Sequence, residues 1–317
     1  MARIFGLIAN RKIRLPELKE VDCELTRLSG VTGFKSGSII SPDRKVYFSY
    51  REKNNHKFKY LKDKTENIYL IVGGTPIQNS KIISPQTILY SYKHQKLNEL
   101  LDELDGFFYL ALVDQEKDRI ILIKDRFGPN PLFYAKVKDG VLISNYASLL
   151  SFATNKGKRK ENKEIVARFA VNHYGEIYGE GHTFYNNVWE VKPATKLTIC
   201  KSKISEENYW QLQSQSDYFE TESEANIADG FTEILLRTAK NNYENIDDYA
   251  FTLSGGMDSG TLISLFKHLY NEKPPAVSIT YKENVRANEM ALIEPIAAEC
   301  AGKWHNIIPT KEEFIGE

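Results

Sequence analysis

Residues 249–260 read YAFTLSGGMDSG, and this stretch decides the fold of the C-terminal part of the chain. Its first five residues form a short apolar run of the kind that makes a buried β-strand. A polar turn with two adjacent glycines follows. After it, apolar residues recur at helical spacing, at Leu262, Leu265, Phe266 and Leu269. The sequence therefore predicts a strand, a glycine turn and an amphipathic helix in direct succession.

The neighbouring residues continue this alternation of strands and helices. Ser223 can cap a helix whose predicted buried face consists of Ile227, Phe231, Ile234 and Leu235. Residues 276–281 predict a second strand, and Asn288 begins a further helix. Strands that alternate with helices indicate a parallel, doubly wound sheet, which binds ligands at the carboxyl ends of its strands.

The turn SGGMDSG has the composition of a phosphate-binding loop. Gly255 and Gly256 permit positive φ and let backbone N–H groups approach phosphate oxygens, and the helix start that follows favours negative charge. Ser254 and Ser259 add hydroxyl donors. Asp258 needs a cation between itself and a phosphate, which makes it a candidate magnesium ligand. The spacing and the lysine of a Walker loop are absent. The alternative is a plain strand–helix connection with an N-cap.

The first ~150 residues have a different pattern, in which short strands alternate with polar turns. Predicted strands cover residues 107–113, 119–124, 132–136 and 141–144. The first two flank the turn-like QEKD and predict a hairpin with one buried face. The basic run NKGKRKENK at 155–163 lacks interleaved aromatic residues and is interpreted as a solvated loop. We expect a first domain at 1–200, a connection at 201–222 and a second domain at 223–317.

Charge and cysteine content exclude several classes of protein. Lys+Arg and Asp+Glu are equal, at 42 each, so the formal net charge is 0 and no global field recruits nucleic acid or an anionic membrane. We predict neither as a partner. Cys23, Cys200 and Cys300 are odd in number and widely spaced, which fits neither a disulfide framework nor a zinc site. A reducing cytoplasm is therefore the expected location. Nowhere do about 18 apolar residues run together, so we expect a soluble protein.

Several motifs, in order along the chain, resemble the asparagine synthetase family. SGGMDSG resembles the pyrophosphatase loop of N-type ATP pyrophosphatases. KDRFGPNPLFY at 124–134 is similar to the family signature RDRFGxxPLYY, and DGFF at 105–108 to its DGxFA segment. Tyr209-Trp210 matches the YW that follows the first domain of the family. The similarity covers most of residues 85–310.

This resemblance implies a fold class and a reaction. The expected fold is an N-terminal αββα sandwich of the Ntn-hydrolase type, followed by an α/β parallel-sheet domain like that of adenine-nucleotide hydrolases. ATP and Mg²⁺ are the implied cofactors: the carboxylate of a small molecule or peptide is adenylated, an amine attacks it, and AMP and pyrophosphate are released. Asp258 is then catalytic and the metal ligand. The expected nucleotide-binding residues are Leu253, Ser254, Gly255, Gly256, Asp258, Ser259, Ser278 and Thr280.

A further similarity lies after the second predicted strand. Asn288-Glu289, followed by Gly302 and His305, resembles the acidic helix start and the G-x-x-H of the family. Glu289 also has a simpler explanation, because an acidic side chain at a helix N-terminus is favoured electrostatically.

Two segments depart from the glutamine-dependent members of the family. Those members begin Met-Cys-Gly-Ile-Phe-Gly, and their cysteine attacks the glutamine amide. Here the corresponding residues are MARIFG, and Ala2 offers no nucleophile. The family's NGEIYN segment, which helps form the glutamine site, aligns with GGTPIQ at 73–78, where its asparagine and glutamate are missing. We therefore predict a scaffold domain without glutaminase activity.

Loss of glutaminase activity changes the implied product. Family members without the cysteine include β-lactam synthetases and lasso-peptide macrolactam cyclases, in which an amine of the substrate attacks its own adenylated carboxylate, a unimolecular step. An ammonia-using asparagine synthetase, a nucleotide-binding partner protein and another pyrophosphatase-loop enzyme stay open. About 60 residues follow the loop, too few for about five strands, so we expect a truncated synthetase domain. A homodimer or a second chain that completes this domain is the expected protein partner.

Overall fold

The structure, a computed structural model, describes residues 2–29, 34–53, 59–63, 65, 67–171, 181–200, 203–213, 222–244, 249–281, 288–310 and 313. The chain divides into two compact units, Met1–Gln213 and Ser214–Glu317. Among the described residues, no helix combines the length and the apolar character needed to cross a membrane.

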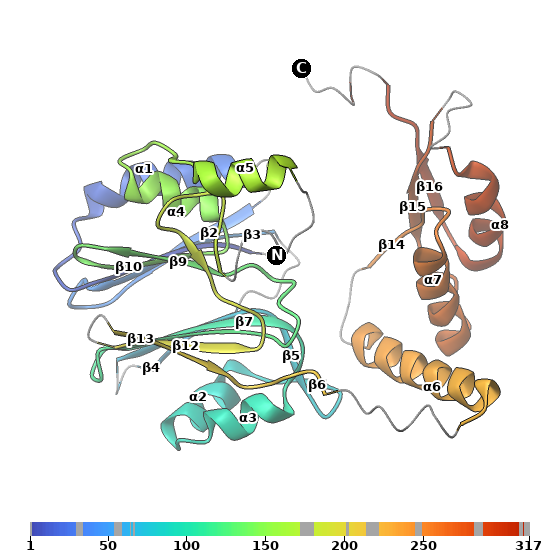
Figure 1. The fold of residues 1–317 in the computed structure, drawn as a ribbon, viewed down its shortest axis with the longest axis horizontal. Coiled ribbons are helices and arrows are strands. Elements are labelled where there is room, and N and C mark those ends of the chain that lie inside the picture. The colour runs from blue at the N-terminus through green and yellow to red at the C-terminus, as the bar shows by residue number, and fades with distance from the viewer. Residues whose placement is uncertain are drawn as a thin grey trace. The chain divides into compact units, whose positions relative to one another are not determined.

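The first sheet of the N-terminal unit has six strands in the order β11-β9-β10-β1-β3-β2. These are β1 (Arg3–Ala9), β2 (Phe34–Ile40), β3 (Val46–Lys53), β9 (Phe133–Val137), β10 (Gly140–Ser144) and β11 (Trp189–Glu190). On one side of this sheet lie α1 (Leu15–Leu28), α4 (Ala147–Thr154) and α5 (Lys163–Val171) (Figure 1). Phe5, Leu25 and Leu149, each at most 1% exposed, belong to the core between this sheet and its helices.

The second sheet has seven strands, in the order β13-β12-β8-β7-β5-β4 with β6 paired to β5. They are β4 (Lys59–Asp63), β5 (Ile68–Gln78), β6 (Lys81–Ile82), β7 (Asp105–Asp114), β8 (Arg119–Lys124), β12 (Thr195–Cys200) and β13 (Lys203–Asn208). Helices α2 (Pro85–Lys93) and α3 (Leu97–Glu103) pack on its outer face (Figure 1). Ser84 starts α2, because its Oγ accepts a hydrogen bond from the amide of Thr87 at 3.2 Å.

The inner faces of the two sheets pack against each other and complete four layers. Tyr109, Phe48 and Leu122 lie in this inner core. Two glycines allow the aromatic rings to approach the backbone: a Cβ at Gly6 would lie 2.4 Å from the Phe48 ring, and one at Gly73 would lie 2.2 Å from the Tyr109 ring. The layers α, β, β, α confirm the predicted N-terminal sandwich.

The predicted hairpin forms, but its prediction of one buried face was wrong. Strands β7 and β8 pair antiparallel, with Leu110 opposite Ile123. Tyr109 belongs to the core between the sheets, whereas its neighbour Leu110 belongs to the core under α2 and α3. Both faces are buried because this sheet is covered on both sides, and a central strand of a sandwich is then apolar without alternation.

The C-terminal unit contains a parallel sheet in the order β14-β15-β16, as the alternation of strands and helices predicts. The strands are β14 (Phe251–Thr252), β15 (Ala276–Ile279) and β16 (Trp304–Ile307). The first two are shorter than predicted, and no strand was predicted at β16. The helices are α6 (Glu224–Tyr243), α7 (Met257–Tyr270) and α8 (Met290–Cys300). Leu253, Ile263, Ala276 and Ile293 form part of the small core that joins sheet, α7 and α8.

The buried face predicted for α6 was wrong. Phe231 and Ile234 are 61% and 53% exposed, whereas Ala239 is buried at 7%. A periodic apolar stripe predicts a face that can be buried, but the packing partner decides which part of it is covered. The capping prediction holds, since Ser223 Oγ accepts from the amide of Asn226 at 3.2 Å.

Part of the range expected to connect the two domains forms a strand. Strand β13 lies inside the range 201–222 and pairs with β12 along its whole length. Its residues therefore belong to the second sheet of the N-terminal unit. The domain boundaries drawn at 200 and 222 stay predictions.

Candidate functional site: the loop between β14 and α7

The predicted phosphate loop lies where a strand ends and a helix begins. Strand β14 ends at Thr252, and α7 begins at Met257. Leu253 anchors the loop: its side chain is 2% exposed, and its amide donates to the Val277 carbonyl of β15 at 2.9 Å. The loop thus stands at the carboxyl end of a parallel strand, the edge at which such sheets bind ligands.

Neither loop glycine has a positive φ, so that explanation was wrong, and Gly255 instead serves close packing. Gly256 is the N-cap of α7 with φ −77° and ψ 151°, and neither it nor Gly255 has a left-handed backbone. A Cβ at Gly255 would instead lie 2.8 Å from the Cβ of Glu289 and 2.9 Å from that of Leu292. Glycine is required because the start of α8 lies directly against the loop.

The two predicted serine donors hold the loop together. Ser259 Oγ accepts from the amide of Ser254 at 3.2 Å and donates to the Ser254 carbonyl at 3.0 Å or the Gly256 carbonyl at 3.1 Å. The two hydroxyl oxygens lie 3.1 Å apart. In this structure both hydroxyls therefore close the turn, and their expected role as phosphate donors stays a prediction.

Asp258 lies in the first turn of α7, and its side chain is exposed. Gly256 has no side chain that could cap α7, so the first-turn amides at 257–259 receive no side-chain cap from it. An uncapped helix start of this kind can bind an anion. No group of three or more His, Cys, Asp or Glu side chains that could hold a metal occurs in the described part of the chain. One carboxylate beside an anion site fits Mg²⁺ held jointly with substrate phosphates, because this ion keeps several waters and needs one or two carboxylates.

Ser278 and Thr280 were predicted to contact the nucleotide, and the structure buries both. Ser278 Oγ donates to the Leu253 carbonyl at 2.7 Å and accepts from Trp304 Nε1 at 2.9 Å. Thr280 Oγ1 donates to Asn306 Oδ1 at 2.8 Å. Both hydroxyls join strands of the sheet, so a role in nucleotide binding would fall to the backbone of this strand.

Two residues after the second strand have different surroundings. His305 is exposed on β16, with its Cα opposite Val277. Glu289 is the residue before α8, and its Oε2 accepts from the amide of Gly255 at 3.0 Å. Sequence reasoning related Glu289 only to the start of its own helix, because a contact between residues 34 positions apart leaves no local signal.

A hollow borders the loop on the helix side of the sheet. It has a volume of about 540 Å³ and is lined by residues of α6, α7 and α8, among them Leu236, Leu265 and Ile296, together with Gly255 and Gly256. Its apolar lining suits the body of an organic group better than a phosphate.

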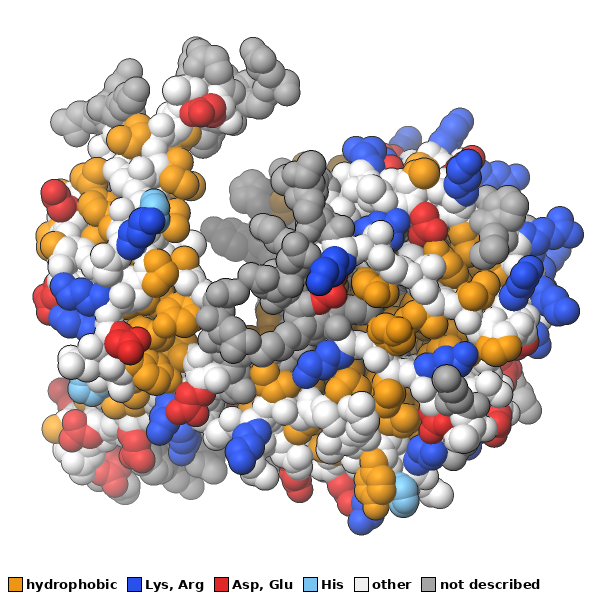
Figure 2. All heavy atoms as spheres, turned by 180° about the vertical axis from the view of Figure 1, so that it is seen from behind, with side chains coloured by type: hydrophobic (Ala, Val, Ile, Leu, Met, Phe, Trp, Pro, Cys, Tyr) orange, Lys and Arg blue, Asp and Glu red, His pale blue; other side chains and the backbone are white. Residues whose placement is uncertain are grey.

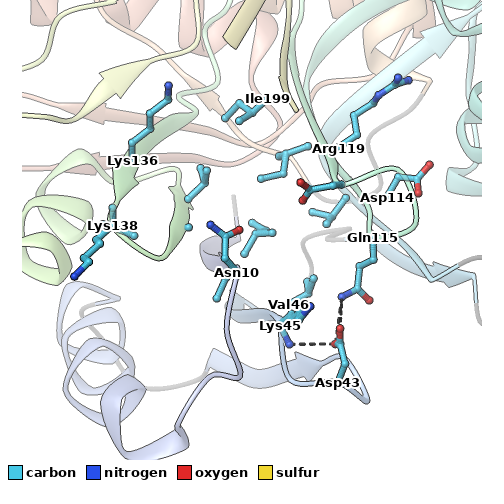
Figure 3. Close-up of a pocket in the computed structure, with 18 residues that line it drawn as sticks. Asn10, Asp43, Lys45, Val46, Asp114, Gln115, Arg119, Lys136, Lys138 and Ile199 are labelled. Carbon is cyan, nitrogen blue, oxygen red and sulfur yellow. Dashed lines mark hydrogen bonds between the residues drawn. The ribbon is translucent and has the colours of Figure 1, made fainter. Parts of the chain in front are cut away.

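A larger hollow, about 640 Å³, lies in the N-terminal unit and does not include any predicted site residue. Figure 3 shows the charged ends of Arg119, Lys136 and Lys138 pointing in different directions. Asp43 is already bonded to Ser41 and Gln115. Although burial raises the pKa of Asp43, these hydrogen bonds hold that pKa below its usual value. Because the charged side chains of this hollow point apart and Asp43 is bonded to its neighbours, we do not assign a ligand to it.

The segments that distinguish this chain from glutamine-dependent enzymes are part of the sandwich. Ala2 is 4% exposed, and its carbonyl accepts from Asn145 Nδ2 at 2.8 Å. Asn145 Oδ1 in turn accepts from the amide of Ile4 at 2.9 Å. The segment 73–78 lies in β5, where Gly74 has φ +84° and a Cβ would lie 2.1 Å from the Phe107 carbonyl. A methyl group thus stands at position 2, and residues 73–78 belong to β5, with a left-handed backbone at Gly74.

The KDRFGPNPLFY segment builds a turn. Asp125, 1% exposed, accepts hydrogen bonds from three backbone amides: Phe108 at 3.1 Å, Phe127 at 3.0 Å and Gly128 at 2.8 Å. Lys124 is equally buried, and its Nζ donates to Glu190 at 2.7 Å. The motif that carries the resemblance therefore has a structural function in this unit.

The fold is an αββα sandwich followed by a unit with a strand, a loop and a helix in succession, and two family models match these two parts of the chain. Residues 85–210 match the family described as Glutamine amidotransferase domain, and residues 231–317 match Asparagine synthase. The chain is 25% identical to the glutamine-hydrolyzing asparagine synthetase 3 of Bacillus subtilis, over 66% of this chain and 34% of that protein. It is 26% identical to the amidase chry2 of Gibberella zeae, over 59% of this chain and 27% of that protein.

A solved structure, glutamine phosphoribosylpyrophosphate amidotransferase from B. subtilis complexed with ADP and GMP, aligns with a TM-score of 0.42 at 9% identity. The alignment covers 96% of this chain and 81% of that one, a likeness too weak to support an inference. The two family matches and the sequence relatives support a member of the asparagine synthetase family. The chain spans about a third of the length of the curated relatives it matches.

Proposed function

We propose that the chain provides the nucleotide loop of an ATP-dependent ligase that joins a carboxylate to an amine with release of AMP and pyrophosphate. The observation that carries this proposal is the loop at 253–256, which lies at the carboxyl end of β14 and opens into an uncapped helix whose first turn contains Asp258. The match of residues 231–317 to the Asparagine synthase family supports it.

The proposed roles follow from the geometry of the loop. The first-turn amides of α7 would stabilise the negative charge that develops on the leaving pyrophosphate. The Ser254–Ser259 hydrogen bonds keep the turn closed, so that these amides do not reorganise during the reaction. Asp258 would hold Mg²⁺ against the phosphates, and this ion would neutralise their charge and polarise the bond that breaks. Leu253 and the backbone of β15 would form the adjoining wall of the nucleotide site.

The source of the amine is a separate proposal. We propose that this chain does not hydrolyse glutamine, because position 2 has a methyl group and the sequence GGTPIQ at 73–78 lacks the asparagine and glutamate of the glutamine site. The amine would then belong to the substrate itself, as in β-lactam or lasso-peptide macrolactam closure, or would be free ammonia, as in an ammonia-using asparagine synthetase. Incubation with glutamine tests this point, and measurable release of glutamate would contradict it.

Protein partners and location also stay proposals. Ile279 and Ile307, 61% and 50% exposed, lie opposite each other on the face of β15 and β16 that α7 and α8 do not cover. This apolar exposure supports a homodimer, or a chain that completes the synthetase domain. The three cysteines are free, which supports a reducing cytoplasm as the location.

Product analysis tests the reaction. The chain is incubated with MgATP and candidate carboxylates and amines, and AMP, ADP and pyrophosphate are quantified. AMP and pyrophosphate in equal amounts are expected, whereas formation of ADP would exclude adenylation. Asp258→Asn should lower AMP production at least about 100-fold, the size expected for loss of one preorganised electrostatic contact. Asp229→Asn, an exposed acid on α6, is the matched control. Equal turnover in both variants would remove Asp258 from the mechanism.

A further inference from the structure

Glu289 stands at the start of α8, but its side chain does not cap that helix. Its backbone has φ −96° and ψ 18°, and its side chain makes no capping hydrogen bond. Its backbone carbonyl begins the helix, since it accepts from the amides of Leu292 at 2.9 Å and Ile293 at 3.1 Å. The carboxylate reaches the neighbouring segment instead, where Oε2 accepts from the amide of Gly255 at 3.0 Å. Glu289 therefore connects α8 to the phosphate loop.

Close packing fixes both ends of this contact. A Cβ at Gly255 would lie 2.8 Å from the Cβ of Glu289 and 2.9 Å from that of Leu292, so the first turn of α8 touches the loop backbone. Ile293, one residue further along α8, is 1% exposed in the core that also contains Leu253 and Ile263. Helix α8 is thus fixed by its packing in the core, and this places the Glu289 carboxylate beside the Gly255 amide.

The amides of the loop divide into two sets. Those of Ser254, Gly255 and Gly256 donate within the protein: to Ser259 Oγ at 3.2 Å, to Glu289 at 3.0 Å and to Ser254 Oγ at 3.4 Å. The amides at 257–259 belong to the first turn of α7, for which Gly256 supplies no cap. The first set of amides stabilises the conformation of the loop. The second set is the one that would bind phosphate oxygens in the proposed function.

We propose that Glu289 is a positioning residue for the phosphate loop: its carboxylate holds the Gly255 amide and so presets the turn from which the start of α7 receives pyrophosphate. This rests on the proposed function. The hydrogen bond and the charge of Glu289 act in opposite directions, because the bond orders the loop whereas a carboxylate beside bound phosphate repels it. Glutamine keeps the acceptor and removes the charge, and alanine removes both.

The first experiment needs no ligand. Hydrogen exchange of the Gly255 amide is followed by NMR in chain labelled with ¹⁵N-glycine, for the wild type, Glu289→Gln, Glu289→Ala and the control Glu294→Ala, an exposed acid on the same helix. We expect slow exchange in the wild type, the glutamine variant and the control. In Glu289→Ala the exchange at Gly255 should be about three- to tenfold faster, the factor for loss of one hydrogen bond. Equal exchange in all four chains would overturn the proposal.

The second experiment measures affinity for inorganic pyrophosphate with Mg²⁺ by calorimetry on the same four chains. The expected order of Kd is glutamine variant at or below wild type, control equal to wild type, and alanine variant about three- to tenfold above it. An alanine variant that binds as tightly as the glutamine variant would show that Glu289 only competes with phosphate, and would overturn the positioning role. Absence of binding in the wild type would overturn the proposed function, while the exchange result would still decide whether Glu289 holds Gly255.

Discussion

The two units of the chain differ in how completely their sheets are covered. Each sheet of the N-terminal unit has helices on one face and the other sheet on its second face, and Tyr109, Leu101 and Ile143 are at 0% exposure in its cores. In the C-terminal unit α7 and α8 cover one face of the sheet, and Ile279 and Ile307 remain exposed on the other. Figure 2 shows hydrophobic side chains on the surface of both units.

The larger hydrophobic core and the candidate site therefore lie in different units of the chain. Apolar burial is the main favourable contribution to folding, so the N-terminal unit has the larger reserve of stability. The candidate site lies on the unit with the smaller core, where each buried side chain represents a larger share of the total. Ligand-binding segments are commonly found in such regions of lower local stability. We therefore predict that a core substitution in one unit does not change the stability of the other unit. Hydrogen exchange, measured peptide by peptide, can test this prediction for each unit.

The largest expected effect is on the N-terminal core. Leu101→Ala removes a fully buried side chain from the packing between α3 and the second sheet and should lower the free energy of unfolding by about 3–5 kcal/mol. Peptides from residues 1–213 should exchange faster, whereas those from 222–310 should not change. Asp102→Ala, at the next and exposed position of α3, is the control. Faster exchange in both units would show that they unfold together.

A smaller effect is expected at the loop of the C-terminal unit. Gly255→Ala forces a Cβ into the space of Glu289 and Leu292, and should destabilise this unit by about 1–3 kcal/mol and weaken its affinity for pyrophosphate. The matched control is Gly230→Ala on α6, where a Cβ meets nothing within 4 Å and should stabilise the helix by about 0.5–1 kcal/mol. Equal stability of the two variants would show that close packing does not explain Gly255.

The smallest effect concerns a charged contact of the N-terminal unit. Hydrogen bonding by Arg27, assisted by the positive charge of Arg159, holds the pKa of the buried Glu24 below its ordinary value, against the opposing effect of burial. Glu24→Gln should therefore cost about 1 kcal/mol at neutral pH, a modest value because the Arg27 side chain is 64% exposed.

The pH dependence of this variant has a definite sign. A lowered pKa in the folded state contributes stability above the unfolded pKa, about 4.3 for glutamate, and that contribution is lost as the pH falls through the folded value. Denaturant unfolding of the wild type and of Glu24→Gln should therefore converge below about pH 4.3. If the two chains still differ in their free energy of unfolding below this pH, the effect of the substitution comes from packing and not from charge.

The sequence by itself determined the order of the elements around the loop and the place of the loop. The apolar runs and glycines at 249–260 predicted β14, the turn and α7, because short-range periodicity and turn chemistry depend on residues close together in the chain. The motif at 124–134 led to the four-layer N-terminal unit, and Ser223 correctly marked the start of α6.

Only the tertiary structure decided what the residues of the loop contact. It brought Glu289 to Gly255 and Trp304 to Ser278, and it gave Gly255 a packing reason in place of a conformational one. It joined Arg159, in a run expected to be solvated, to Glu24. It also left Phe231 outside the core of its unit. The physical reason is the same in each case: these contacts join segments that the fold brings together from distant parts of the chain, and a local pattern contains no information about its partner.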